Sequence, residues 1–367
     1  MKIYIRSVAN ISPQETFGNV PFLPKTIEYN GNSLTAIEPD YTNIIDSKLV
    51  RRMSRIIKMG VAAACECLKD GNEKNPGAII TGTAYGCLED TQKFLESIII
   101  QNEETLSPTA FIQSTHNTVG AQIALLLHCN QYNNTFVHRG FSFESALLDA
   151  IILLKEKESS NVLVGGIDEL TDVSYSILNR FGLYKRAPVS NLDLYLSNTK
   201  GTIAGEGAAF FLLAAEPSEN DYAQIDAIAT FYKLKSFTEI KNQIFNFLET
   251  HSIEMNEIDL IITGKDGDIK SDEIYNNLEK SIFSNNEIIN YKHLCGEYPT
   301  SISFALWLAS KILKSREVPP AAALKTFKKN KINRILIYNN YQNTHHSLIL
   351  ISSSQFKNEQ TIFEEST

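Results

Sequence analysis

Nucleophilic and basic side chains gather between residues 138 and 145. His138, Ser142 and Ser145 lie where a short apolar strand pattern gives way to a helical pattern. A serine beside a histidine is suited to covalent acyl transfer, because the imidazole can take the hydroxyl proton. A serine in the first turn of a helix is also a common cap of free backbone N–H groups. Ser142 is therefore open to two interpretations, an unusual nucleophile or a helix cap.

Two further histidine sites and one acidic run allow similar pairs of interpretations. His116 precedes an apolar helical segment; like His138, it is either a substitute base or interface contact, or an ordinary structural residue. His345-His346 fall in a turn between two strand patterns, with no third ligand nearby in sequence, and are interpreted as structural or surface residues. The run Asp266-Gly267-Asp268 suggests a metal loop or a turn, and the lack of calcium-loop spacing favours the turn.

The cysteines are few, and their spacing is not that of a metal site. Their number is odd and no CxxC pair occurs, which argues against a disulfide framework and a structural zinc site. The five are Cys65, Cys67, Cys87, Cys129 and Cys295. The long interval between Cys129 and Cys295 contains no thiol. We expect neither a metal nor a cofactor.

Composition and charge restrict the classes of protein to which this chain can belong. Of the 367 residues, 43% are hydrophobic and 21% are charged, which is typical of a soluble globular protein. A net charge of −8 and the lack of a long basic run argue against nucleic-acid binding. No apolar stretch approaches the length of a membrane span, and the first residues lack the apolar region of a signal peptide. We therefore expect a cytoplasmic protein without membrane insertion.

Strand and helix patterns alternate along the chain, and the second half repeats the order of the first. Continuous apolar strands between helices are typical of a parallel or mixed sheet that is covered on both faces. The sequence thus predicts an α/β fold. Strands are predicted over 2–10, 77–86, 133–140, 161–169, 205–216, 222–232, 258–264, 334–341 and 347–353, and helices over 49–70, 88–101, 118–129, 142–157, 237–251 and 302–313.

Four segments in order resemble the β-ketoacyl synthase family of the thiolase fold. They are RRMSRIIKMGVAAACECL (51–68), GGIDE (165–169), GTIAGEGAAFFLL (201–213) and KHLCGEYPTSISFALWLA (292–309). The resemblance implies two similar βαβαβ-type halves in a five-layer α-β-α-β-α architecture. It places the halves at residues 1–216 and 217–354, followed by a polar tail over 355–367.

The resemblance also implies where catalytic groups should stand. The family forms carbon–carbon bonds with a cysteine that carries the acyl chain and two histidines that stabilise an enolate. In this sequence the cysteine position holds Gly140, the histidine positions hold Gly264 and Glu297, and the family's lysine is kept as Lys292. The chain therefore resembles a subunit that has lost its catalytic groups.

Degenerate subunits of this kind resemble chain-length factors, which pair with an active ketosynthase and help to wall its acyl tunnel. This resemblance implies a heterodimer that has acyl carrier protein as a partner. The basic pairs Arg51-Arg52 and Lys185-Arg186 are either docking patches for this acidic partner or ordinary solvated surface charges. Segments 107–120 and 140–150 most resemble proteins of aryl-polyene and flexirubin-type pigment clusters. The residues predicted to shape the tunnel or the interface are Phe111, His116, Asn117, His138, Phe141 and Phe143.

Three functions are open at this stage. The first is a non-catalytic, chain-length-factor-like partner, which the loss of all three catalytic positions favours. The second is an active 3-oxoacyl-ACP synthase or other acyltransferase that uses Ser142 or another unfamiliar group. The third is a scaffold that binds acyl carrier protein without forming a tunnel.

Overall fold

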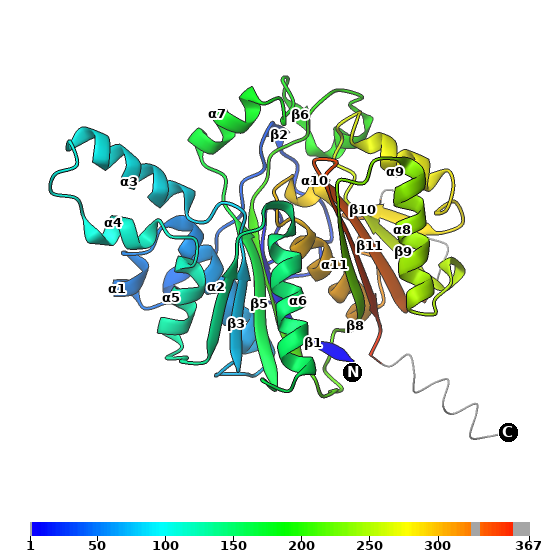
Figure 1. Ribbon diagram of the computed structural model, residues 1–367, viewed down its shortest axis with the longest axis horizontal. Helices are drawn as coiled ribbons and strands as arrows, with labels where there is room; N and C mark the ends of the chain where they lie inside the picture. The colour runs from blue at the N-terminus through cyan, green and yellow to red at the C-terminus, as the bar shows by residue number, and fades with distance from the viewer. Residues whose placement is uncertain (1, 324–330, 355–367) are drawn as a thin grey trace.

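A ten-stranded sheet forms the centre of the protein (Figure 1). The computed structural model describes residues 2–323 and 331–354, so the predicted tail over 355–367 lies outside the described residues. The strand order is β10-β9-β11-β12-β8-β1-β7-β5-β3-β4. The strands are β1 (Ile3–Ile11), β3 (Ala78–Gly82), β4 (Tyr132–Phe136), β5 (Asn161–Asp168), β7 (Gly207–Ala214), β8 (Ala223–Tyr232), β9 (Leu260–Thr263), β10 (Glu287–Asn290), β11 (Arg334–Tyr341) and β12 (His345–Ser352), with β2 (Asn30–Gly31) and β6 (Val189–Ser190) paired separately.

The two ends of the sheet repeat one pattern. At the first end, β3 is parallel to β4 and β5, and β7 is antiparallel to both β5 and β1. At the second end, β9 is parallel to β10 and β11, and β12 is antiparallel to both β11 and β8. β1 and β8 join the two ends through three residue pairs, centred on Tyr4 and Gln224. The predicted repeat of element order is thus present, while the boundary between residues 216 and 217 stays a prediction.

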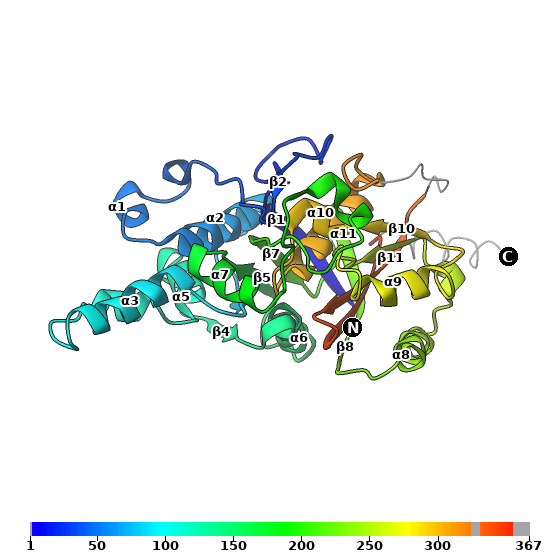
Figure 2. The same ribbon diagram turned by 90° about the horizontal axis from the view of Figure 1, so that it is seen from above.

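Helices cover both faces of the sheet. Figure 2 shows α2 and α6 on opposite faces of the strands between them. Within residues 2–323 and 331–354, every helix is too short or too polar to cross a membrane. The helices are α1 (Ser47–Val50), α2 (Arg55–Asp70), α3 (Leu88–Ile100), α4 (Pro108–Gln113), α5 (Thr118–Leu126), α6 (Ser142–Lys155), α7 (Asp172–Arg180), α8 (Phe237–Thr250), α9 (Asp272–Glu279), α10 (Lys292–Cys295) and α11 (Ile302–Ser315), with 3₁₀ turns η1 (Tyr41–Asn43), η2 (Arg139–Phe141), η3 (Asn191–Leu196) and η4 (Met255–Glu257).

Apolar clusters show how the layers are stacked. One cluster packs α2 and α5 against β1, β3, β5 and β7. A second cluster combines α6 and α11 with strands from both ends of the sheet, so these two helices form the central layer. A third packs α8 and α9 against β9, β11 and β12. Together they give the five-layer α/β fold of the thiolase type that the sequence predicts.

The helix predicted over 49–70 is divided in the structure. Helix α1 ends at Val50, a turn with the exposed Arg51 and Arg52 follows, and α2 begins at Arg55. The guanidinium of Arg55 donates to both carboxylate oxygens of the buried Glu206 at 2.5 Å and to Glu38 at 2.5 Å. This cluster fixes the start of α2 beside β7, because a buried carboxylate requires a paired cation.

Candidate functional site

Strand β11 passes the region where the predicted catalytic positions lie. Gly140 lies in the 3₁₀ turn η2, Gly264 directly follows β9, and Glu297 follows α10. Two β11 side chains, Asn339 and Tyr341, lie against the first two of these positions. Tyr341 also lines a cavity together with Glu297. The fold therefore brings the three positions into one region, around a single strand.

Gly140 has no room for a side chain. A Cβ atom at this residue would lie 2.7 Å from Cδ1 and 3.0 Å from Cβ of Tyr341, and 3.1 Å from Cβ of His345. Non-bonded carbon atoms normally stay about 3.5–4.0 Å apart. Two of the three blocking atoms are Cβ atoms, which move only with their backbone. A cysteine at residue 140 therefore requires a shift of the β11–β12 hairpin.

Gly264 is blocked in the same way. A Cβ atom here would overlap Oδ1 of Asn339 and would lie 2.9 Å from the hydroxyl of Tyr275. The hydroxyl of Tyr291 donates to the same Asn339 oxygen at 2.9 Å, which holds the amide in place. The space that an imidazole at residue 264 would occupy is thus taken by an ordered polar group.

Glu297 forms an ion pair with Lys292. Both side chains are buried, and Lys292 donates directly to Oε2 of Glu297, while the hydroxyl of Ser301 lies 3.4 Å from Oε1. Burial raises the pKa of Glu297 to about 7, and the nearby Lys292 charge opposes that rise. The retained lysine therefore compensates the carboxylate that stands where the second histidine is expected.

The hydroxyl of Ser142 is bound to the turn that precedes α6. Its hydroxyl donates to the backbone oxygen of Arg139 at 2.8 Å and accepts from the backbone N–H of His138 at 2.8 Å, and the residue is fully buried. The nearby Nδ1 of His138 lies 3.1 Å from the hydroxyl of Ser145, at the surface. Ser142 therefore does not cap the first N–H groups of α6 as the sequence suggests; both hydrogen-bonding roles of its hydroxyl are used to hold the preceding turn.

The cysteines are free thiols in protected positions. Burial raises the pKa of Cys65 to about 11 and that of Cys67 to about 12, and it raises those of Cys87 and Cys295 further. A reactive thiol needs a lowered pKa and access to substrate. These four thiols have neither the lowered pKa nor the access to substrate that a nucleophile needs.

The residues predicted to shape a tunnel or interface fall into two groups. Phe111, His116, Asn117 and His138 are exposed, on α4, on the segment before α5 and on the segment after β4. Phe141 and Phe143 are buried on either side of the α6 start. The Phe141 ring lies 4.7 Å from the His345 ring, and the Phe143 ring lies 5.6 Å from the Phe211 ring in the central layer.

Sequence reasoning missed the side chains that fill the site. Asn339 and Tyr341 belong to a strand pattern with no mark of function, and only the fold places them opposite the glycines. It also treated Asp168 merely as part of a motif, although this buried carboxylate accepts from Thr83, Ala84 and Thr300 at 2.8–3.1 Å. Asp168 thereby joins the ends of β3 and β5 to the segment before α11.

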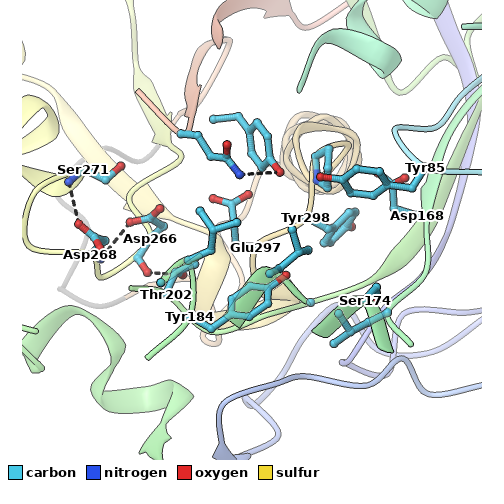
Figure 3. A pocket seen from close by; sticks show the side chains of 18 of the residues that line it. Tyr85, Asp168, Ser174, Tyr184, Thr202, Asp266, Asp268, Ser271, Glu297 and Tyr298 are labelled. Atoms are coloured by element: carbon cyan, nitrogen blue, oxygen red, sulfur yellow. Dashed lines mark hydrogen bonds between the residues drawn. The ribbon is translucent and has the colours of Figure 1, made fainter. Parts of the chain in front are cut away.

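A cavity of about 340 Å³ opens in front of these residues (Figure 3). Asp266 and Asp268 lie on its wall; Asp268 accepts from the N–H groups of Lys270 and Ser271, which is the geometry of a turn. Among the described residues, no group of three His, Cys, Asp or Glu side chains is placed to hold a metal.

A basic groove lies beside this cavity, and its structure corrects the prediction for one of the two docking patches. Lys185 was grouped with Arg186 as a surface pair, but its side chain is buried and donates to Thr199 and to the Gly267 carbonyl. Arg186 remains exposed and lines a cavity of about 770 Å³ with Arg180 and Lys200.

Comparison with known proteins identifies the first half of the chain. Residues 31–208 match the family described as Beta-ketoacyl synthase, N-terminal domain. Over these residues, just under half of the chain, the sequence is similar to the β-ketoacyl synthase family. No curated protein sequence matches the chain.

Solved ketosynthase structures share the fold over almost the whole chain. The ishigamide ketosynthase/chain length factor aligns with a TM-score of 0.77 at 15% identity, covering 96% of this chain and 99% of that one. The ketosynthase ApeO in complex with its chain length factor ApeC, from Xenorhabdus doucetiae, gives 0.71 at 14% identity, covering 96% and 98%. AntDE:AntF, a type II PKS acyl-carrier protein in complex with its ketosynthase, gives 0.71 at 17% identity, covering 96% and 99%. These similarities show the ketosynthase-type fold.

Proposed function

We propose that this chain is the non-catalytic, chain-length-factor-like subunit of a cytoplasmic ketosynthase heterodimer. The observation that carries the proposal is the packing of Tyr341 against Gly140, because the residue that should tether the acyl chain has neither a side chain nor space for one. The blocked position of Gly264 and the Lys292–Glu297 pair support it. The similarity to structures that contain chain length factors is consistent with this role.

The edge of the sheet offers a surface for the partner ketosynthase. β4 is the last strand of the sheet, so one side of its backbone is unpaired, and unpaired edges favour association. Exposed apolar side chains stand on α5, after β4 and on α6: Leu125, Val137 and Ile152, which are 66%, 48% and 48% exposed. Phe111 on the neighbouring α4 is 56% exposed. We assign the partner interface to this face.

Phe141 and Phe143 are proposed to limit the acyl tunnel of the heterodimer. Both lie at the start of α6, next to the former nucleophile position. A bulky ring at the end of a tunnel sets the number of two-carbon units, because a longer chain must displace it. The product is assigned to polyketide- or fatty-acid-type synthesis of aryl polyene or a related pigment, on the resemblance of segments 107–120 and 140–150.

Acyl carrier protein is the proposed third component. Arg180, Arg186 and Lys200 form a basic groove on a chain of net charge −8, and an acidic carrier protein complements such a groove. Charge reversal by Arg186→Glu with Lys200→Glu should slow carrier association with the heterodimer, and Lys235→Glu on the distant loop before α8 should not. Stopped-flow fluorescence at low salt measures the rate.

Co-expression with a cysteine-bearing ketosynthase tests the whole proposal. We expect a heterodimer in native mass spectrometry, with products whose length changes on Phe141→Ala. Ile152→Lys should abolish the heterodimer, whereas Phe245→Lys, on α8 at the other end of the sheet, should leave it intact. An acyl adduct on Ser142 of the isolated chain, together with turnover, would contradict the proposal and favour an active acyltransferase. Unchanged product length in an intact heterodimer would favour a scaffold.

A further inference from the structure

Helices α3 and α4 form an arm that stands away from the body of the protein. Figure 1 and Figure 2 both show the two helices projecting past the end of the sheet that β4 forms. Among the described residues, the four apolar core clusters include no residue of either helix. The helices pack on each other, with the rings of Phe94 and Phe111 5.4 Å apart, and Gln113 at the base of the arm donates to the backbone oxygen of Arg52. The arm is therefore held by its own packing and its base.

The outer face of α3 is apolar. Leu95 and Ile99 are four residues apart, so they lie on one face of the helix, and Ile100 follows directly. These side chains are 54%, 76% and 77% exposed. Phe94 and Ile98, one position earlier in each turn, are half-buried, so the packing of the arm uses a different face. A single exposed apolar side chain is ordinary, but a contiguous group of this kind marks a site of association.

The same arm carries mainly negative charge. Residues 88–113 contain five acidic residues and one basic residue, Lys93, which pairs with Glu89 at 2.5 Å. Glu103 and Glu104 are exposed at the free end, in the connection between the helices. An apolar face beside such charge is repelled by an anionic membrane surface and by an equally acidic second copy of the arm. It fits a protein surface that is apolar in its centre and basic at its rim.

The position of the arm identifies that protein. The partner interface proposed above lies on the β4 edge and α5, where Leu125 and Val137 are exposed, and the exposed Phe111 links this face to the arm. A ketosynthase packed on the β4 edge would extend along the arm, because the arm projects past the same edge.

We infer that the α3–α4 arm clasps the partner ketosynthase and makes the chain select this partner over a second copy of itself. The apolar face supplies affinity, and the acidic end supplies selection, because a chain of net charge −8 offers an acidic arm a poor match. This inference rests on the proposed function, since it requires the heterodimer, and it names the surface that decides the pairing.

Hydrogen exchange of the full chain, alone and bound to the co-expressed ketosynthase, tests the inference. We expect amide exchange in α3 to slow by about tenfold or more in the heterodimer, while exchange in α8, at the other end of the sheet, stays unchanged. A heterodimer in which α3 exchanges as fast as in the free chain would overturn the arm assignment and leave the proposed function standing. Absence of any heterodimer in native mass spectrometry would refute both. Slowing in the isolated chain that grows with its concentration would mean that a second copy covers the arm, and would overturn the assignment.

One apolar substitution tests the affinity of the arm. Ile99→Ser should raise the dissociation rate of the heterodimer about tenfold, because it removes a side chain that is buried only in the complex. Its exposure in the free chain means that urea unfolding of the isolated chain should not change. Phe245→Ser, on α8, is the matched control and should leave the dissociation rate unchanged. Subunit exchange followed by native mass spectrometry gives the rates, and equal rates for Ile99→Ser and the wild type would overturn the clasp.

One pair of charge substitutions tests the selection. Glu103→Gln with Glu104→Gln should slow association with the ketosynthase several-fold at low salt, and the difference should shrink at high salt. Glu249→Gln with Glu273→Gln, which removes two exposed charges from α8 and α9, should not slow association. Stopped-flow fluorescence measures these rates. Faster or unchanged association of the Glu103 and Glu104 variant would show that the partner surface under the arm is not basic, and would refute the selection by charge.

Discussion

Restoring the missing nucleophile should destabilise the protein. In Gly140→Cys, the new Cβ would lie 2.7–3.1 Å from three carbon atoms of Tyr341 and His345. Overpacking of this kind costs about 1–3 kcal/mol. Replacing glycine also lowers the entropy of the unfolded chain, which stabilises by about 0.4–1 kcal/mol. The overpacking term is larger, so the free energy of unfolding should fall by roughly 1–2 kcal/mol.

A double-mutant cycle measures this clash directly. Tyr341→Ala removes the ring atom at 2.7 Å, so Gly140→Cys should cost less in that background, with a coupling energy of about 1 kcal/mol or more. Gly31→Cys is the control, because a Cβ atom there meets nothing within 4 Å. Urea unfolding of the four cycle members and the control gives all the free energies.

The outcome for the thiol completes the test. We expect mass spectrometry to find no acyl adduct on Cys at residue 140 after incubation with an acyl thioester. A Gly140→Cys variant as stable as the wild type, with a thiol that is acylated as fast as an exposed cysteine, would refute the argument that Tyr341 fills the site.

Three further predictions concern the buried charges and rings. Lys292→Ala should lower the free energy of unfolding in urea by about 3–5 kcal/mol, because it leaves Glu297 unpaired. The double change Lys292→Met with Glu297→Met should cost less than this single change. A loss below about 1 kcal/mol for Lys292→Ala would show that the pair is hydrated. Burial raises the pKa of Glu144 from 4.5 to about 7, so the folded chain keeps a proton that the unfolded chain loses, and stability falls as the pH rises through 7. Between pH 5.5 and 8.5 the wild type should therefore lose about 2 kcal/mol more than Glu144→Gln, and parallel pH profiles would contradict the raised pKa. Phe143→Ala should lower the free energy of unfolding in urea by about 3–5 kcal/mol, because its ring is buried. Phe111→Ala should lower it by under about 0.5 kcal/mol, because its ring is exposed. Equal losses would contradict these positions.

The sequence predicts most of the elements because their apolar patterns are continuous. The strand over 161–169 and the helix over 142–157 appear as β5 and α6, with ends shifted by at most two residues. The short elements β10 and α7 were missed, since four and nine residues are too short for their patterns to stand out from the flanking loops. The division of the helix over 49–70 depends on Glu206, a residue far along the chain, and local patterns do not contain that information.

The candidate site was predictable only in part. A glycine at residue 140 shows from the sequence alone that no thiol is present. That the same place is filled by Tyr341 depends on a pairing between segments about two hundred residues apart, which spacing does not reveal. For the same reason Lys185 was taken for a surface charge, although the loop at Gly267 folds over it.

The central layer has a consequence for any attempt to divide the chain. Helix α11 belongs to the second half of the sequence, yet it packs against β1 and β7 of the first half as well as β11 and β12. A fragment ending near residue 216 would expose the apolar faces of β1 and β7 to water. The free energy lost with this burial is far larger than that lost with the hydrogen bonds between β1 and β8. The two halves are therefore repeats in topology but a single unit in thermodynamics, and should melt in one transition.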